Sequence, residues 1–474
     1  MEGKYIWDLE KYRLNTAIID ELGKKYSYQW VSEQCYEIVS QIGKRCLVMS
    51  FCTNTVGSLL GYVAFVNNGI VPIMVSAELD GELTASLSEE YRPQYYWIPV
   101  ERQAVVKGSK VFAAHGYVLI RSTYDTEFPL FDKLALLLTT SGSTGSPKLV
   151  RQSYENIRVN MQSIARYLRL DETERPITTL QMNYTYGISI INSHLLVGAS
   201  LIITSKTLMQ REFWQQFKEY GATSFGGVPY TYEMLDKLRF FRMELPTLRT
   251  MTQAGGKLSQ ELHKKFAEYA QSTGRNFVVM YGQTEATARM AYLPPDKAVT
   301  KCGSMGIAIP GGKFRLVDDN GVEIKTVDTV GELIYEGANV TLGYAEKGED
   351  LIKGDERNGV LATGDMAKQD EDGYFYIVGR KKRFLKIFGS RVNLDETERL
   401  LKSRFTDIDI ACGGIDDKMY IFIASDEGAE SIKRFLVEKL NFHSSAFETV
   451  YVDSIPRNAS GKILYSSLSK YYQS

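Results

Sequence analysis

The chain has 474 residues, of which 44% are hydrophobic and 24% are charged. This length and composition are typical of a globular protein with two or three domains, and they exclude a disordered or collagen-like chain. The 56 basic and 57 acidic residues leave a net charge of -1, which gives no reason to expect a polyanionic partner such as nucleic acid.

No segment of the sequence is typical of secretion or membrane insertion. The five cysteines are odd in number and form no Cys-x-x-Cys pair, which favours a reducing compartment. Acidic residues occur early at the N-terminus without an apolar stretch, so we expect no signal peptide. The longest nearly apolar stretch, Val56–Val66, is far shorter than the about 20 residues of a membrane helix, and it predicts a buried helix. We therefore expect a cytoplasmic protein with no membrane partner.

Short apolar runs alternate with longer amphipathic segments from about residue 45 to residue 300. The runs Cys46–Met49, Ile70–Val75 and Ser200–Thr204 predict strands. The segments Val56–Asn67 and Lys206–Tyr220 predict helices. Strands that alternate with helices indicate an α/β fold with a mainly parallel sheet.

The pattern changes after residue 300. Three short strand candidates follow, separated by turns rich in aspartate and glycine: Lys313–Val317, Gly331–Tyr335 and Tyr374–Val378. This pattern favours a smaller β-rich module. After the basic cluster Arg380–Arg383, roughly 90 residues have a pattern of strands and helices of their own, which is enough for a small domain. We place a domain boundary near Lys382.

Residues 139–148 read Thr-Thr-Ser-Gly-Ser-Thr-Gly-Ser-Pro-Lys and follow the apolar run Leu134–Leu138. Glycines allow backbone N–H groups to approach an anion, hydroxyls add donors, and a lysine adds positive charge, so this loop is suited to bind phosphate. It is not a Walker P-loop, because Ser146 and Pro147 separate the last glycine from Lys148. Taken alone, this composition is also typical of a flexible linker.

Four further segments follow in order. They read YGQTE at 281–285, GELIYEGANVTLGY at 331–344, LATGDMAKQDEDGYFYIVGR at 361–380 and PRNASGKI at 456–463. With the loop, in this order and spacing, they resemble the acyl-adenylate-forming superfamily of acyl- and aryl-CoA synthetases, peptide-synthetase adenylation domains and luciferases. The resemblance spans about Leu47 to Lys462. Each segment alone is typical of a turn or a solvated surface, and only their joint order indicates the family.

The resemblance implies a fold and a division into domains. The expected fold is α/β, with a large N-terminal domain of α/β layers plus a distorted β-barrel, and a small α+β C-terminal domain that covers the active site. The expected domains are 1–381, the AMP-binding domain, and 382–474, a mobile domain that carries the catalytic lysine.

The resemblance also implies an ATP-dependent acid–thiol ligase that uses Mg²⁺. A carboxylate attacks the α-phosphate of ATP to give an acyl-adenylate and pyrophosphate, and a thiol of CoA or of a carrier-protein phosphopantetheine then displaces AMP. The matching positions predict catalytic roles for Lys462, Glu285 and Thr284, with Glu285 as the magnesium ligand. The ATP-binding residues implied in the same way are Thr140, Ser141, Gly142, Ser143, Thr144, Gly145, Lys148, Gly255, Gly256, Lys257, Tyr281, Gly282, Gln283, Asp365 and Arg380.

The positions that match the family imply specific tasks for several of these residues. Asp365 is expected to accept the ribose hydroxyls, with Arg380 as its neighbour. Lys462 is expected to bridge the attacking carboxylate and the α-phosphate. Lys382 occupies the family's hinge position, and rotation about it would move Lys462 away and bring Gly389 toward the thiol channel.

The residues expected to line the acid pocket are Asn183, Tyr184 and Gly187. Amino-acid-activating relatives carry an aspartate where this chain has Asn183, which has no charge to offer an amine. The pair Asn183–Tyr184 resembles members that activate hydroxylated benzoic acids, so we expect an aryl or small acyl acid. Tyr465 departs from the family pattern, because it stands where an arginine is often found.

Two other functions remain open from the sequence. The chain could be an amino-acid-activating adenylation enzyme, or a non-catalytic nucleotide-binding relative that kept the fold. Such a relative is expected to have lost Lys462 or Glu285, and both are present.

Overall fold

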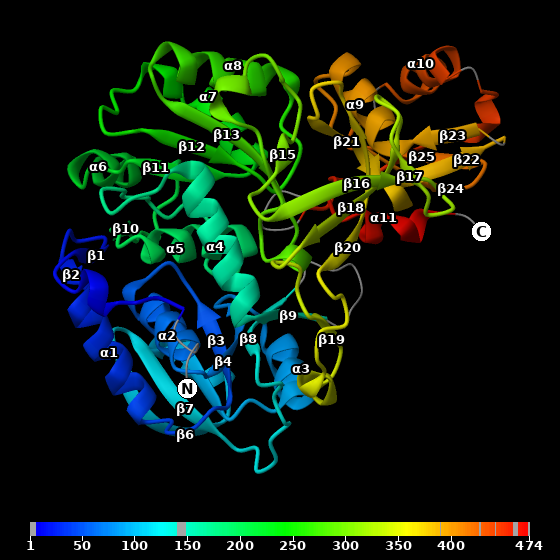
Figure 1. Cartoon of the computed structure of the whole chain (residues 1–474). Helices are drawn as coiled ribbons and strands as arrows, with labels where there is room; N and C mark the ends of the chain where they lie inside the picture. Colours follow the sequence, from blue (N-terminus) through cyan, green and yellow to red (C-terminus); the bar gives the residue numbers. More distant parts are fainter. Residues whose placement is uncertain are drawn as a thin grey trace. The chain divides into compact units, whose positions relative to one another are not determined.

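The computed structural model describes residues 6–139, 148–388, 390–425, 428–440, 442–457 and 463–472 (Figure 1). These residues form two compact units. The first contains the described residues up to 313 and residues 335–361, and the second contains residues 314–334 and the described residues from 362 onward. The boundary predicted at residue 382 lies inside the second unit. The division into 1–381 and a mobile domain, 382–474, therefore stays a prediction.

An eight-stranded sheet forms the base of the first unit. Its strand order is β19-β9-β8-β4-β3-β5-β7-β6. The strands are β3 (Leu47–Cys52), β4 (Val71–Ser76), β5 (Tyr95–Pro99), β6 (Gly108–Ala114), β7 (Tyr117–Ser122), β8 (Leu134–Thr139), β9 (Leu149–Ser153) and β19 (Gly343–Ala345).

The predicted parallel arrangement is right for the centre of this sheet and wrong for its flanks. Strand β3 pairs in parallel with β4 and β5, and β4 pairs in parallel with β8, whereas the outer pairs are antiparallel. A two-residue turn, His115 and Gly116, joins β6 to β7, and both residues have positive φ angles of 50° and 77°. This is the geometry of a tight hairpin, which forces antiparallel neighbours.

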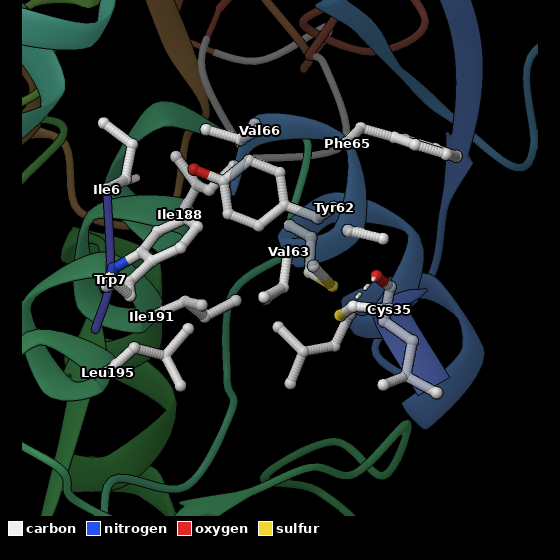
Figure 2. Close-up of a cluster of buried hydrophobic side chains, with 14 of the residues drawn as sticks. Ile6, Trp7, Cys35, Tyr62, Val63, Phe65, Val66, Ile188, Ile191 and Leu195 are labelled. Carbon is white, nitrogen blue, oxygen red and sulfur yellow. Dashed lines mark hydrogen bonds between the residues drawn. The ribbon is translucent and has the colours of Figure 1, made fainter. Parts of the chain in front are cut away.

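Helices cover the faces of the sheet and bury a large apolar core. They are α1 (Tyr28–Ser40), α2 (Val56–Asn67), α3 (Gly81–Tyr91), α4 (Tyr154–Leu168) and α5 (Thr185–Leu196). Figure 2 shows Tyr62 and Val63 of α2 facing Ile188, Ile191 and Leu195 of α5, with Trp7 beside them. Because every residue of α2 after Val56 is buried, the prediction of a buried helix is confirmed.

A second sheet of the first unit has the order β11-β12-β13-β14-β15. Its strands are β11 (Ser224–Gly227), β12 (Thr250–Gln253), β13 (Asn276–Tyr281), β14 (Ala291–Tyr292) and β15 (Ile307–Ala308), and its helices are α6 (Arg211–Glu219), α7 (Pro229–Lys237) and α8 (Gln260–Ser272). A small third sheet pairs β10 (Leu201–Ile202), β1 (Thr16–Ile19) and β2 (Lys25–Ser27). Helix α6 begins later than the predicted Lys206, because the Gln210 side chain accepts a hydrogen bond from the Thr207 backbone and holds a turn there.

The second unit contains most of a five-stranded sheet with the order β17-β16-β18-β20-β21. The strands are β16 (Gly312–Val317), β17 (Glu323–Ile324), β18 (Gly331–Gly337), β20 (Val360–Gln369) and β21 (Phe375–Arg380). Among the described residues, no pairing of β17 with β21 closes these strands into the expected barrel. The mixed α/β class is confirmed.

The C-terminal part of the second unit has its own core. It consists of β22 (Phe384–Ile387), β23 (Ser390–Asn393), α9 (Leu394–Arg404), β24 (Ile410–Ile415), β25 (Lys418–Ile423), α10 (Ala429–Leu440), β26 (Phe447–Tyr451) and α11 (Tyr465–Leu468). Apolar residues of α9, α10 and the β24-β25-β26 sheet pack together, as the sequence pattern predicts. In the described part of the chain, no helix is long and apolar enough to cross a membrane.

Candidate functional site

Strands β8 and β9 bracket the loop of glycines and hydroxyl residues. Their antiparallel register pairs Thr139 with Leu149, so the two ends of the loop lie side by side. Six of the predicted phosphate-binding residues lie outside the described residues: Thr140, Ser141, Gly142, Ser143, Thr144 and Gly145. Lys148, the lysine that ends the loop, is described.

Sheet register brings Lys148 to the end of the predicted segment 331–344. Strand β19 lies antiparallel to β9 and pairs Ala345 with Leu149. The next residues along the two strands are Glu346 and Lys148, and their side chains form an ion pair. The Lys148 ammonium lies 5.7 Å from the centre of the Tyr344 ring. A cation and an aromatic ring at this distance attract each other, which places the lysine over Tyr344.

Glu285 lies in a short 3₁₀ turn, Thr284–Ala286, that follows strand β13. Its backbone carbonyl accepts hydrogen bonds from the Thr341 amide at 3.0 Å and from Arg357 Nη1 at 3.1 Å. Its carboxylate oxygen Oε1 accepts a hydrogen bond from the Tyr344 hydroxyl at 2.7 Å. Backbone and side chain are therefore both held, and Oε2 accepts no hydrogen bond from a described residue.

Tyr344 connects the predicted phosphate lysine to the predicted metal ligand. Arg357 lies over the same ring, with its guanidinium carbon 4.7 Å from the ring centre. Burial, together with the negative charge of Glu285, raises the pKa of Tyr344 to about 12. The hydroxyl therefore keeps its proton near neutral pH and remains a donor to Glu285.

Sequence reasoning missed three residues of this cluster. Tyr344 and Thr341 lie within the segment 331–344, so their position in a motif could have identified them as candidate site residues. Arg357 lies outside every motif, and only the folded chain brings it to Tyr344 and Glu285.

The backbone after Glu285 adopts an unusual conformation. Thr287 and Ala288 have φ angles of 52° and 97°, which residues with a side chain rarely adopt. The Asn339 side chain holds this turn by donating to the Ala286 carbonyl at 2.8 Å and to the Arg289 carbonyl at 3.0 Å. Gly282 is required here, because a Cβ atom would lie 1.5 Å from the Ala288 carbonyl oxygen.

The remaining predicted residues of this segment follow strand β13 directly. Tyr281 is the last residue of β13, and its hydroxyl accepts a hydrogen bond from Gln283 Nε2 at 3.3 Å. Thr284 opens the 3₁₀ turn, half-buried, one residue before Glu285. The structure therefore brings Tyr281, Gln283, Thr284 and Glu285 together at one end of the second sheet.

The predicted ATP-binding segment Gly255–Lys257 and the predicted acid pocket meet at Gly255. Its φ angle is +83°, and a Cβ atom there would lie 2.5 Å from the Tyr184 hydroxyl. Gln253 holds the turn by donating to the Gly256 carbonyl at 2.9 Å. Lys257 follows, and its side chain is exposed.

The other two predicted pocket residues lie at the start of α5. Asn183 is half-buried and precedes the helix. Gly187 lies within α5, where a Cβ atom would lie 2.3 Å from the Gln181 carbonyl oxygen. The close backbone packing alone requires this glycine, whether or not it contacts a substrate.

Replacing Gly255 by alanine is expected to lower kcat/KM for the acid about 10-fold, because the new methyl group displaces the Tyr184 hydroxyl. Gly274→Ala is the matched control, since Gly274 also has a positive φ of 65° but no atom within 4 Å of the added Cβ. Both variants are expected to lose about 1 kcal/mol of unfolding free energy from the left-handed backbone. Equal kinetic losses in the two variants would show that backbone strain, and not the contact with Tyr184, causes the effect.

Asp365 and Arg380 lie opposite each other in the second unit. The antiparallel register of β20 and β21 pairs these two residues. Arg380 Nε lies 2.8 Å from Asp365 Oδ1; the aspartate side chain is 4% exposed and the arginine side chain 55% exposed. The predicted ribose residue and its predicted neighbour are therefore in direct contact.

Lys382 lies in a short 3₁₀ turn, Lys381–Arg383, between β21 and β22. Lys381 Nζ lies 2.6 Å from Glu332 Oε2, and Arg383 Nε lies 2.7 Å from Asp395 Oδ1. Both neighbours of Lys382 are thus tied to other parts of the second unit.

The predicted catalytic Lys462 lies outside the described residues, as does Gly389. Residues on either side of Lys462 are described, and Arg457 and Ile463 form an antiparallel bridge. Tyr465, which departs from the family pattern, donates its hydroxyl to Glu398 Oε2 at 3.0 Å, and the Arg383 guanidinium stacks 3.6 Å from its ring centre. The tyrosine therefore belongs to the same cluster of contacts that anchors Arg383.

Comparisons with known proteins identify the family. A sequence model described as AMP-binding enzyme matches residues 8–345. The chain is 28% identical over 356 residues to a 2-succinylbenzoate–CoA ligase of Geobacillus sp. (strain WCH70), covering 72% of this chain and 69% of the relative. It is 30% identical over 355 residues to the 4-coumarate–CoA ligase-like 4 protein of Oryza sativa subsp. japonica, covering 72% of this chain and 63% of that relative. The match thus spans about two thirds of the length of each relative.

Solved structures share the fold over nearly the whole chain. The o-succinylbenzoate coenzyme A synthetase of Bacillus subtilis, in complex with ATP and magnesium ion, superimposes with a TM-score of 0.77 at 19% identity and covers 96% of both chains. ATP-bound MatB from Rhodopseudomonas palustris superimposes with a TM-score of 0.77 at 21% identity, covering 98% of this chain and 96% of that one.

Proposed function

Because the chain belongs to the AMP-binding enzyme family, we propose that it is an ATP-dependent acid–thiol ligase that forms AMP. In the first half-reaction, a substrate carboxylate attacks the α-phosphate of ATP, and pyrophosphate leaves. In the second, a thiol attacks the acyl carbon of the acyl-adenylate, and AMP leaves. The observation that carries this proposal is the cluster of Lys148, Tyr344 and Glu285. Tyr344 contacts both the lysine proposed to bind phosphate and the carboxylate proposed to bind the metal ion.

The first half-reaction brings two anions together, so the site must supply positive charge. Lys148 would contact the β- and γ-phosphates together with the loop residues 140–145. Lys462 would contact the attacking carboxylate and the α-phosphate. Thr284 would donate a hydrogen bond to the α-phosphate.

Glu285 suits a magnesium ion that is bound together with the nucleotide. Mg²⁺ prefers oxygen ligands and is usually held by one or two carboxylates plus substrate phosphates and water. No group of three His, Cys, Asp or Glu side chains forms a metal site among the residues that the structure describes. A single carboxylate, with Oε1 fixed by Tyr344 and Oε2 accepting no hydrogen bond from a described residue, fits such an ion. The ion would neutralise the phosphate oxygens when bound.

The residues proposed to contact the nucleoside lie in the motifs that resemble the family's ATP site. Tyr281 would stack against adenine, and the backbone at Gly255 and Gly256 would approach the edge of the base. Asp365 would accept the ribose hydroxyls, and its contact with Arg380 holds the carboxylate in one orientation.

We propose an aryl or small acyl acid as substrate and CoA or a carrier-protein phosphopantetheine as the thiol. The names of the two sequence relatives, 2-succinylbenzoate–CoA ligase and 4-coumarate–CoA ligase-like 4, support aryl acids and CoA. Asn183 at the start of α5 supports a substrate without an α-ammonium group.

ATP–pyrophosphate exchange with a panel of carboxylic acids tests the proposal. Exchange that requires both an acid and Mg²⁺ is expected, followed by formation of a CoA or carrier-protein thioester from the same acid. Binding of ATP without exchange for any acid in the panel would contradict it and would favour a non-catalytic relative. Exchange with amino acids alone would favour an amino-acid-activating enzyme.

Lys382→Pro is expected to slow the second half-reaction and to leave the first nearly unchanged. Proline fixes φ at the proposed hinge, while the ion pairs of Lys381 and Arg383 hold the residues on either side. Pyrophosphate exchange should stay within about 3-fold of the unmodified protein, and thioester formation from supplied acyl-adenylate should fall at least about 10-fold. Lys382→Ala is the matched control, since it removes the side chain and leaves the backbone free to rotate. A similar loss in both half-reactions, or a similar effect of alanine, would contradict a hinge at this residue.

A further inference from the structure

Among the residues whose burial the structure describes, Arg289 and Arg151 are the two arginines that are almost completely buried, with 2% and 0% of their surface exposed. Arg151 is neutralised by an ion pair with Glu356, and it also donates to the carbonyl oxygens of Tyr344 and Leu342. Arg289 has no such partners. Among the described residues, no carboxylate forms an ion pair with it.

Within the described part of the chain, the side chain of Arg289 contacts only groups without charge. Nε donates to the Ser189 hydroxyl at 3.2 Å, and Nη1 donates to the Tyr167 hydroxyl at 3.2 Å and contacts the Met280 sulfur. The guanidinium carbon lies 4.5 Å from the centre of the Tyr186 ring. No hydrogen bond from Nη2 to a described residue is formed.

The ionisable neighbours of Arg289 supply no negative charge. Burial raises the pKa of Tyr167 and of Tyr186, so both rings keep their protons at neutral pH. Burial, together with the positive charge of Arg289, lowers the pKa of His194 to about 4, so this histidine is neutral at neutral pH. The guanidinium is therefore a buried cation without a counter-ion in this part of the protein.

Burying an unpaired charge is costly, and proteins usually pair such a charge or use it to bind a ligand. The cation is also held firmly in place. Its backbone carbonyl accepts hydrogen bonds from the side chains of Asn160 at 2.9 Å and Asn339 at 3.0 Å. A rigid, buried guanidinium whose Nη2 forms no hydrogen bond to a described residue is suited to bind a carboxylate through a charge-assisted hydrogen bond.

Arg289 adjoins the residues proposed for the acid pocket. It lies four residues after Glu285, and a Cβ atom on Gly282 would lie 3.0 Å from its Cα. Tyr186 and Ser189, which contact it, lie on helix α5 directly after Asn183 and Tyr184. The charge of Arg289 also reaches Tyr184, since it opposes the rise in the pKa of that tyrosine caused by burial.

We propose that Arg289 binds a second carboxylate of the acid substrate, so that the enzyme prefers dicarboxylic acids. This inference rests on the proposed adenylation activity and adds the substrate class to it. One carboxylate attacks the α-phosphate and releases pyrophosphate, while the other stays unmodified and pairs with the guanidinium. The acyl-adenylate and the thioester therefore both retain a free carboxylate.

The test is ATP–pyrophosphate exchange with pairs of acids that differ only in the second group. Succinate, glutarate, adipate and phthalate are each compared with their monomethyl esters, and butyrate, hexanoate and benzoate serve as simple monoacids. For the best pair, the diacid is expected to exceed its monoester at least about 100-fold in kcat/KM, because the ester leaves the buried cation unpaired. Equal rates for diacids and monoesters in the unmodified protein would overturn the inference and leave the proposed ligase activity intact. No exchange with any acid would instead contradict the proposed ligase activity.

Two variants locate the preference at Arg289. Arg289→Met, which keeps the length of the side chain and removes the charge, is expected to reduce the diacid-to-monoester ratio to about 1, mainly through a higher KM for the diacid. Arg289→Lys is expected to keep part of the preference, because it keeps the charge and loses the fixed, planar geometry of the guanidinium. Circular dichroism and thermal unfolding check that both variants fold. A folded Arg289→Met protein that keeps the full preference would overturn the assignment, and if neither variant folds, the comparison of acids in the unmodified protein still decides the substrate class.

Discussion

Lys462→Ala is expected to lower ATP–pyrophosphate exchange at least about 100-fold while thioester formation from supplied acyl-adenylate stays near its original rate. The physical reason is that the attacking carboxylate and the α-phosphate repel each other most strongly in the first half-reaction, and an ammonium group between them lowers this repulsion. The second half-reaction starts from an acyl-adenylate that is already formed, so it does not need this charge. Exchange assays and single-turnover thioester assays on the same protein measure the two effects.

Lys470→Ala is the matched control for Lys462→Ala. Lys470 is an exposed lysine near the same end of the chain, and it is expected to have no effect on either half-reaction. Equal loss of both half-reactions in Lys462→Ala would contradict a role confined to adenylation. It would also weaken the proposal that Lys462 moves away before the thiol attacks.

Glu285→Gln is expected to lower exchange about 100-fold and to raise the Mg²⁺ concentration that gives half-maximal rate. The amide has nearly the same size as the carboxylate, and its oxygen can still accept a hydrogen bond from Tyr344, but it lacks the negative charge that attracts the cation. A titration of exchange rate against Mg²⁺ at fixed ATP separates a lost metal ligand from general damage to the site.

Glu261→Gln is the control for this charge change, since Glu261 is an exposed residue in the first turn of α8. Its Mg²⁺ dependence should match that of the unmodified protein. If Glu285→Gln lowers the rate without changing the Mg²⁺ dependence, Glu285 orients the site through its contact with Tyr344 and does not bind the metal.

The secondary-structure elements that were predicted correctly are those whose sequence pattern lies within a few neighbouring residues. The apolar run at Val56–Val66 became the buried helix α2. The aspartate- and glycine-rich turn expected before the predicted strand Tyr374–Val378 joins β20 to β21, with Gly373 at a φ of 84°. The prediction of a mainly parallel sheet was wrong at the flanks, because hairpins such as the one at His115 and Gly116 are set by two φ angles that the apolar pattern does not reveal.

The site was predicted in part. Motif order led to Lys148 and Glu285, but it gave no role to Tyr344, which contacts both. Arg357 and Arg289 were missed, because one arginine in a sequence is most often a solvated surface residue. Their roles depend on burial and on contacts to residues far away in the chain.

The sequence by itself determined the order of strands and helices, the α/β class and the family, because near neighbours set local conformation and because motif residues keep their order and spacing. Only the tertiary structure decided which of these residues meet. Lys148 and Glu346 are 198 residues apart, and the register of β9 and β19 pairs them. That no described residue supplies a counter-ion for Arg289 is likewise a property of the folded interior, since a charge becomes costly only when packing has removed the water around it.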